Sequence, residues 1–413
     1  MGVLFEQRTS WRLSQLDRWS DMGLGSGPTK AGVELSETTA EGLPTVFACV
    51  RVISSAVAQL PLKLYRVGDD GAKTEATDHP LYEVLHDLAN PEMTAFDLRA
   101  LLTSHLLLWG NAFAEIERDP AGRVVALWPL LPWRMHVDRD DRRRLRFRYA
   151  ARDPWIFDPA RPPIFRLMIH SQDGITGRSP VRVLRESMGL TLALQEFGAA
   201  FFKNGTTFGG ILSAKDRDID PESDDGKQIR ETVAGLHARP DKAHRMLVLG
   251  GDWTFHQLGV PPEDAQFLES RKFQRSELCG AYGVPPHMIA DLERATFSNV
   301  ENESLRWLRD GLEPYLGNWE GAIRRDLIGP RAFSRSYARF TRNAMVRGDL
   351  GSRSKALATM RQNGIISANE WRALEEMDPI RAADGGDVYI VNTAAQPATA
   401  PDDDDARSPT VDD

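Results

Sequence analysis

Cysteine is scarce in this sequence. Its 413 residues include only Cys49 and Cys279, which lie far apart and each stand among apolar residues. Two cysteines are too few for a disulfide-rich secreted scaffold or for a zinc site with several thiolate ligands. We therefore expect two buried free thiols in a protein made in a reducing compartment. A single Cys49–Cys279 disulfide stays open as the alternative.

A long apolar run is also missing. The most apolar stretch, residues 187–202, has sixteen residues and contains Gln195 and Glu196. A helix that spans a bilayer needs about 20 apolar residues. Residues 1–20 lack the basic, apolar and cleavage regions of a signal peptide. We expect a soluble protein that is made in the cytoplasm and does not contact a membrane.

The motifs of the common enzyme chemistries are missing as well. Gly226-Lys227 is the only Gly-Lys pair, and its neighbours do not complete a phosphate-binding loop. There is no G-x-S-x-G, no H-E-x-x-H and no paired C-x-x-C motif. His79 and His86 are expected as ordinary surface or core histidines, and the acidic residues of 138–141 as a solvated turn. We expect no catalytic residue, no metal and no cofactor.

What the sequence does contain is a globular composition with an excess of acidic charge. Hydrophobic residues make up 41%, charged residues 27%, and the net charge is −8. The whole chain is therefore not an electrostatic binder of DNA. The one local exception is residues 142–148, where Arg144, Arg146 and Arg148 alternate with apolar residues. This strand face either binds phosphate groups or is exposed to solvent. The alternation of arginine and apolar residues favours the solvent-exposed face.

The first part of the chain predicts an α+β region. A helix that begins at Thr45 carries an apolar stripe. The stripe consists of Val46, Cys49, Val50, Ile53 and Val57. A second helix opens at Thr94, with Asp97 in the position of a capping box. Strands are expected at 62–65, 112–118, 123–130 and 144–149, with turns at 68–71 and 119–122.

Longer helices are predicted from residue 179 onward. Residues 180–202 form one helix, apolar nearly all round from Met188, and residues 262–282 form a second. Residues 206–259 lie between them as a small insert. Its elements are expected at 210–213, 221–237, 245–249 and 253–258. Two long apolar helices around an insert indicate a stalk with a tip, which can bury its surface only against further copies of the chain.

The C-terminal third predicts three more helices. Apolar residues at spacings of three and four mark a helix at 300–327, with a kink at Pro314. Shorter helices follow at 350–362 and 368–376, the second with a capping box. The tail from residue 392 is acidic and rich in Pro, Ala and Thr, so we expect it to be disordered.

Seven short stretches carry the strongest pattern in the sequence. They are TVFACVRVIS (45–54), LLWGNAF (107–113), RVVALWP (123–129), GRSP (177–180), PEDAQFL (262–268), GVPP (283–286) and DLERATFSN (291–299). Together and in this order they resemble the portal proteins of the HK97-like phage group, over residues 45 to 380. Similar proteins occur in gene transfer agents and prophages.

The resemblance implies a ring of subunits, typically twelve, at one vertex of a capsid, without enzymatic activity. Double-stranded DNA would pass through the ring during packaging and ejection. The implied partners are further copies of the chain, the large terminase, the major capsid protein and a head–tail adaptor. The implied location is the virion, after synthesis in the cytoplasm of a bacterial host.

The resemblance also implies the regions into which such a subunit divides. They are an N-terminal arm (1–43), a wing (44–178, completed by a spine helix and strand at 300–348), two stem helices (179–205 and 261–283), a clip (206–260), a channel loop (284–299), a crown (349–391) and an acidic tail (392–413).

The channel loop supplies the candidate site residues. They are Asp291, Leu292, Glu293, Arg294, Thr296, Phe297 and Ser298. Glu293 and Arg294 would form a mixed lining past which DNA slides, with Thr296 and Ser298 as weak polar contacts. A plain loop that connects two helices is the alternative for each residue. The rival identities are a head–tail adaptor, and a nuclease or packaging ATPase.

Overall fold

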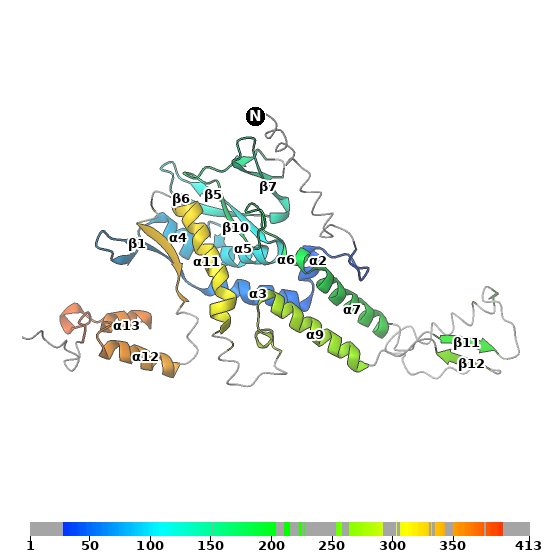
Figure 1. Cartoon of the computed structure of the whole chain (residues 1–413). Coiled ribbons are helices and arrows are strands. Elements are labelled where there is room, and N and C mark those ends of the chain that lie inside the picture. The colour runs from blue at the N-terminus through cyan, green and yellow to red at the C-terminus, as the bar shows by residue number, and fades with distance from the viewer. Residues whose placement is uncertain are drawn as a thin grey trace, which may run out of the picture. The chain divides into compact units, whose positions relative to one another are not determined.

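The computed structural model consists of two compact units (Figure 1), Met1–Thr341 and Arg342–Asp413, which we describe one at a time. It describes residues 28–150, 152–203, 210–214, 223–224, 227, 253–257, 264–291, 303, 306–329, 332, 335–342, 350–375 and 377–390. The class is α+β, as the sequence predicts.

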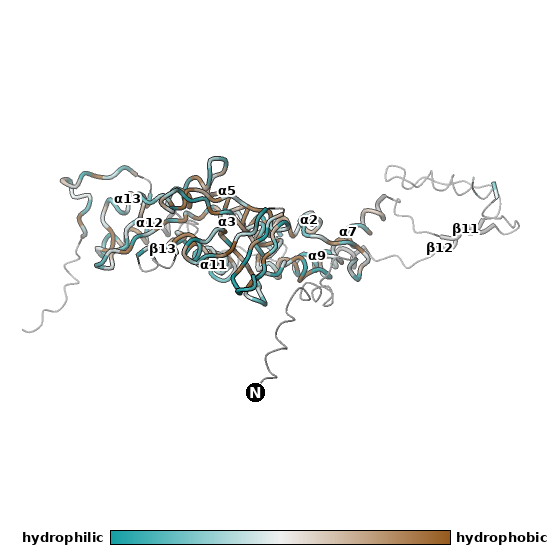
Figure 2. Tube along the Cα trace, turned by 90° about the horizontal axis from the view of Figure 1, so that it is seen from above, coloured by the Kyte–Doolittle hydropathy of each residue, from teal (hydrophilic) through white to brown (hydrophobic). Residues whose placement is uncertain are grey.

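The core of the first unit is built on helices α3 (Pro44–Gln59) and α5 (Ala95–Trp109), which pack against each other. All five residues of the predicted stripe on α3 are buried. Figure 2 shows hydrophobic residues along both helices. The Thr94 side chain accepts a hydrogen bond from the Asp97 amide, as expected of the cap of α5. Thr45 is not the cap of α3, because the helix starts one residue earlier with Pro44, whose fixed φ suits the first position.

The described part of the first unit also contains three antiparallel sheets of three strands each. Their strand orders are β10–β5–β6 (Ile164–Met168, Asn111–Arg118, Val124–Leu130), β7–β8–β9 (Met135–Arg139, Leu145–Tyr149, Trp155–Ile156) and β13–β1–β2 (Ser336–Phe340, Leu62–Val67, Lys73–Glu75). A short hairpin of β3 (Leu88–Asn90) and β4 (Met93–Thr94) lies near α4 (Pro80–His86). The predicted strands and both predicted turns are therefore confirmed.

Gly110 and Gly177 bring two distant segments into backbone contact. Gly110 ends α5 with φ of 73°, and a Cβ there would lie 2.1 Å from the carbonyl oxygen of Arg178. A Cβ on Gly177 would lie 2.0 Å from the carbonyl oxygen of Gly110. Only glycine fits at these two places. Both glycines belong to the short stretches that carry the family resemblance.

The helix expected at 180–202 is two helices. Helix α6 (Pro180–Val183) ends at Leu184, which has a non-helical backbone, and α7 (Arg185–Lys203) follows at once. The break has a packing reason, since α6 contacts α5 whereas α7 contacts α9 (Asp264–Tyr282). Residues 28–43, expected as part of an arm, include helix α2 (Glu37–Glu41), whose Glu37 pairs with Arg182 at 2.9 Å.

Of the insert, the structure describes the hairpin of β11 (Gly210–Ala214) and β12 (Trp253–Gln257). These two strands confirm the edges predicted at 210–213 and 253–258. The strand predicted at 245–249 and nearly all of the helix predicted at 221–237 lie outside the described residues.

The helix expected near 300–327 carries two π-helical turns. Turn η6 (Leu308–Leu312) leads into α11 (Glu313–Ile323), and turn η7 (Arg324–Ile328) ends it. Pro314 sits in the first turn of α11 next to η6, where the wider turn accommodates its missing N–H. Trp319 on α11 is buried, and its ring centre lies 5.4 Å from that of Phe165 on β10.

The second unit contains the two helices that the sequence predicts. They are α12 (Leu350–Gln362) and α13 (Ala368–Leu374), followed by a short 3-10 turn, η10 (Ala382–Asp384). Gly364 after α12 has φ of 68°, and Ser367 and Glu370 form the capping box of α13. The described part of α13 ends at Leu374, shortly before the expected end at residue 376.

Candidate channel segment and assembly surfaces

Of the seven predicted channel residues, Asp291 is the one that the structure describes. Arg275 on α9 donates a hydrogen bond of 2.9 Å from its guanidinium to the Asp291 carboxylate. Leu292, Glu293, Arg294, Thr296, Phe297 and Ser298 lie outside the described residues. Their contact with DNA stays a prediction. The structure adds the position of Asp291, which the hydrogen bond from Arg275 fixes near the C-terminal end of α9.

The two ends of this segment meet. The short turn η5 (Pro286–Ile289) follows α9, and the Nδ1 atom of its His287 lies 3.1 Å from the carboxylate of Glu303. The His287 side chain is only 8% exposed, whereas that of Glu303 is 57% exposed, so the contact lies at the surface. The described residues on either side of 292–302 therefore lie close together, because Glu303 contacts His287, four residues before Asp291.

Helices α7 and α9 form a pair with an uneven surface. The Thr191 hydroxyl on α7 donates a hydrogen bond to the buried Gln274 side chain on α9. On the outside, Phe197 and Leu190 of α7 are 49% and 45% exposed, and Phe273 of α9 is 69% exposed. Large exposed apolar side chains on one helix pair indicate a contact surface.

One expectation about the pair is wrong. The described outer residues of α9 around Phe273 are mostly charged or polar, among them Glu269, Arg271 and Lys272. An apolar outer surface is thus a property of α7 and of single residues on α9, not of both helices. The apolar residues of α9 that the structure describes as buried, such as Leu278 and Cys279, lie inside the first unit, where α9 packs against α3.

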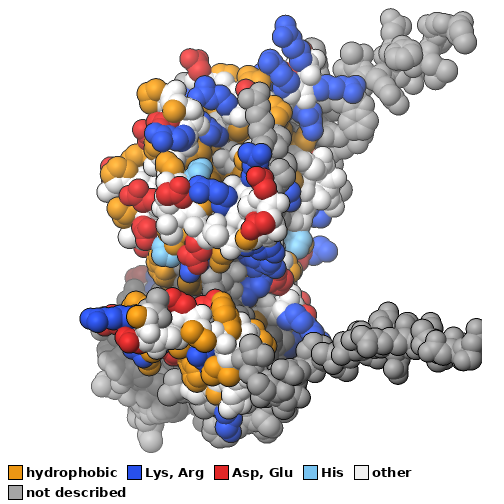
Figure 3. All heavy atoms as spheres, turned by 90° about the vertical axis from the view of Figure 1, so that its left-hand side faces the viewer, with side chains coloured by type: hydrophobic (Ala, Val, Ile, Leu, Met, Phe, Trp, Pro, Cys, Tyr) orange, Lys and Arg blue, Asp and Glu red, His pale blue; other side chains and the backbone are white. Residues whose placement is uncertain are grey.

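The arginines of the predicted strand face all pair with carboxylates of their own hairpin. Arg146 and Arg148 each lie within 2.8 Å of the Asp138 carboxylate, and Arg144 lies 2.8 Å from Asp140. The hydrogen bond from Arg146 is the main cause that lowers the pKa of Asp138. This pairing supports the solvated-face interpretation. Figure 3 shows acidic, basic and apolar side chains interspersed over one face of the molecule.

The two cysteines are in contact. Cys49 on α3 and Cys279 on α9 are free, fully buried and joined by a side-chain hydrogen bond. This bond and burial raise the pKa of the Cys49 thiol. The prediction of buried free thiols is confirmed. Their proximity could not be read from the sequence, because 230 residues separate two unremarkable cysteines.

A groove of about 1010 Å³ lies between hairpin β7–β8 and residues 173–183. Trp109 and Trp133 line it with ring centres 4.9 Å apart, and the buried His105 packs against both. Burial lowers the pKa of His105 to about 4, and its Nδ1 atom has no hydrogen-bond partner among the described residues. Sequence reasoning did not single out this groove.

No group of three or more His, Cys, Asp or Glu side chains among the described residues could hold a metal ion. None of the helices described has the length and apolarity needed to cross a bilayer.

Comparison with known proteins defines the class. The family model for phage portal proteins matches residues 44–376. The portal protein of Enterobacteria phage HK97 is 32% identical over 387 residues, which cover 92% of this chain and 89% of that protein.

Two solved structures share the fold. One is an HK97 family phage portal protein from Corynebacterium diphtheriae, with a TM-score of 0.56 and 15% identity over 75% of this chain and 96% of the other. The second comes from the neck of a native gene transfer agent particle, computed with C12 symmetry. Its TM-score is 0.54 and its identity 22%, over 88% of this chain and 99% of the other.

Sequence and fold thus agree on a structural component of a phage or gene transfer agent capsid. The chain belongs to the phage portal protein family.

Proposed function

We propose that twelve copies of this chain form a ring at one capsid vertex and that double-stranded DNA passes through the ring during packaging and ejection. The observation that carries this proposal is the pair α7–α9, which exposes Phe197, Leu190 and Phe273 beside a loop whose ends are clamped together. The C12 symmetry of the gene transfer agent neck supports the number of copies.

The regions of the ring follow from the elements. In this proposal α7 and α9 are the stem and the β11–β12 hairpin belongs to the clip. The sheets around α3 and α5, together with α11, are the wing, and α12 and α13 are the crown. The clip docks the large terminase during packaging and a head–tail adaptor afterwards, and the wing contacts the major capsid protein.

In this proposal the channel segment binds the passing DNA only weakly. A lining that neutralised many phosphates would hold DNA in place through counterion release. Glu293 and Arg294 together add no net charge, so in this proposal the passing phosphates meet a mixed surface. The chain's net charge of −8 is compatible with such a passage.

The exposed aromatic residues provide the test. We expect Phe197→Asp and Phe273→Asp to shift the purified protein from rings to monomers in light scattering, because each places a charge in an apolar contact. Phe96→Asp is the matched control, since Phe96 is 42% exposed but lies on α5. Rings that persist in both stem variants would contradict the assignment of α7 and α9 to the ring contact.

A further inference from the structure

A second, smaller recess on the first unit is lined by arginines. It has a volume of about 380 Å³ and lies between hairpin β7–β8, strand β10 and turn η7. Its floor is apolar and consists of Leu145, Phe147, Phe157, Pro159 and Ile164. Its charged side chains are Arg139, Arg143, Arg144, Arg166, Arg325 and Asp326. Five cations thus share a small recess with one carboxylate.

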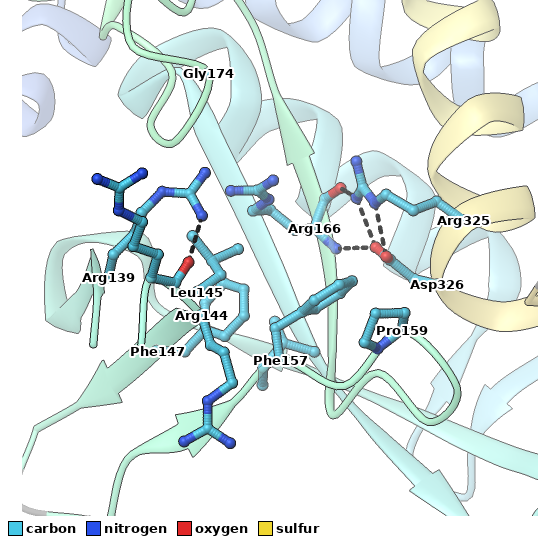
Figure 4. A pocket seen from close by; sticks show the side chains of 12 residues that line it. Arg139, Arg144, Leu145, Phe147, Phe157, Pro159, Arg166, Gly174, Arg325 and Asp326 are labelled. Carbon is cyan, nitrogen blue, oxygen red and sulfur yellow. Dashed lines mark hydrogen bonds and ion pairs between the residues drawn. The ribbon is translucent and has the colours of Figure 1, made fainter. Parts of the chain in front are cut away.

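Two of these arginines are already neutralised. Arg325 binds the buried Asp326 with hydrogen bonds of 2.6 and 2.7 Å. Arg144 pairs with Asp140 at 2.8 Å and points away from the others (Figure 4). Asp326 also accepts a hydrogen bond of 3.0 Å from the backbone N–H of Arg166, so both of its carboxylate oxygens are engaged.

Two of the other three arginines, Arg139 and Arg166, are held by neutral groups. The Arg139 guanidinium donates to the carbonyl oxygen of Arg143 at 2.8 Å, and that of Arg166 donates to the carbonyl oxygen of Ile175 at 2.6 Å. Among the residues that the structure describes, Arg139, Arg143 and Arg166 form no ion pair with a carboxylate. In Figure 4 the guanidinium groups of Arg139 and Arg166 lie on one side of the recess, beneath the loop that carries Gly174.

Arg166 is the most deeply buried of the three. It is only 8% exposed, and its guanidinium lies 6.0 Å from the centre of the Phe147 ring. Burial, followed by repulsion from Arg325, lowers its pKa to about 10, which still leaves it charged at neutral pH. The Arg166 guanidinium forms no ion pair, although the charges of Asp326 and Asp173 attract it. A bound anion in direct contact would therefore stabilise this buried cation.

We propose that this recess is a binding site for a phosphate group carried by a nucleotide or by a DNA strand. Arg139, Arg143 and Arg166 would bind the phosphate oxygens, and the apolar floor would take the attached sugar or base. Three guanidinium groups suit the several oxygens of a phosphate better than the two oxygens of a carboxylate. The proposal goes beyond the ring and does not depend on its formation.

Titration of the full-length protein tests the proposal. The probes are pyrophosphate, dAMP and a 20-base-pair DNA duplex, with glutarate as the carboxylate probe, all followed by calorimetry. We expect Arg139→Gln and Arg143→Gln each to weaken binding of a phosphate probe about tenfold, because each removes one charge-assisted contact. Both residues are exposed, so the variants should fold, which circular dichroism checks. Arg142→Gln, an exposed arginine of the same turn that does not line the recess, is the control.

The probes and variants distinguish a site for free nucleotides, a site for the DNA backbone and the failure of the proposal. Binding of dAMP or pyrophosphate that both variants weaken and the control keeps supports a site for free nucleotides. Binding of the duplex with the same variant pattern supports a site for the DNA backbone. No binding of any phosphate probe, equal loss in Arg142→Gln, or glutarate binding as tight as that of the phosphates would overturn the proposal, the last result pointing to an acidic peptide instead.

Discussion

Asn111 and Gly177 are joined by two hydrogen bonds of 2.8 Å each, although 66 residues separate them. The Asn111 amide donates to the Gly177 carbonyl oxygen, and its oxygen accepts from the Gly177 N–H. Ser179 adds a hydrogen bond of 2.7 Å to the carbonyl oxygen of Leu108. These contacts fasten the segment before α6 and α7 to the end of α5. Two of the short stretches that resemble the portal family therefore form one structural joint.

The first prediction concerns this joint. Asn111→Leu should lower the free energy of unfolding by about 2–4 kcal/mol, because two half-buried backbone groups lose their partners. Thermal or urea unfolding measures the change. Asn363→Leu, on the surface after α12, is the control and should change stability little. An Asn111→Leu protein as stable as the parent would contradict the role of the joint.

The second prediction concerns pH. His105 has a pKa of about 4 in the folded protein and about 6.5 when unfolded, so the unfolded chain binds more protons between these values. The stability from neutral His105 is complete above pH 6.5 and falls, by about 3 kcal/mol, as the pH drops toward 4. His105→Phe should remove this part of the pH dependence, measured by unfolding at pH 7.5 and 4.5. His86→Gln, at a half-buried histidine, should not, and an unchanged slope in His105→Phe would refute the assignment.

The third prediction concerns the thiols. Cys49 and Cys279 are fully buried, so we expect both to react with a disulfide reagent at least about a hundredfold more slowly in the folded than in the unfolded protein. Ala121→Cys places a thiol in an exposed turn and is the positive control. Rapid reaction of two thiols in the native parent protein would show that the contact between α3 and α9 opens easily.

The fourth prediction concerns the clamped ends of the channel segment. His287→Ala removes the partner of Glu303 and frees the two ends, so rings should still form but protect less DNA from nuclease in a packaging reaction. His86→Ala, which alters a half-buried histidine on α4, is the control. Full packaging by His287→Ala would mean that the clamp does not matter for DNA passage.

The sequence predicts the local elements well and the long-range contacts poorly. The stripe on α3, the cap at Thr94 and the capping box at Ser367 depend on neighbouring residues, and the structure confirms them. The break at Leu184 arises because α6 and α7 pack on different partners, which no periodicity records.

The candidate sites also depend on long-range contacts, which the sequence predicts poorly. The contact between Cys49 and Cys279 and the arginine recess arise from segments far apart in the chain, so their residues look ordinary in sequence. The channel residues from Leu292 to Ser298 rest on the family resemblance and stay predictions.

Electron microscopy of the purified protein tests the central claim most directly. We predict closed rings of twelve subunits around an open channel wide enough for duplex DNA, with Phe197 and Phe273 covered by the neighbouring copy. A well-folded monomer that forms no rings even at high protein concentration would contradict it.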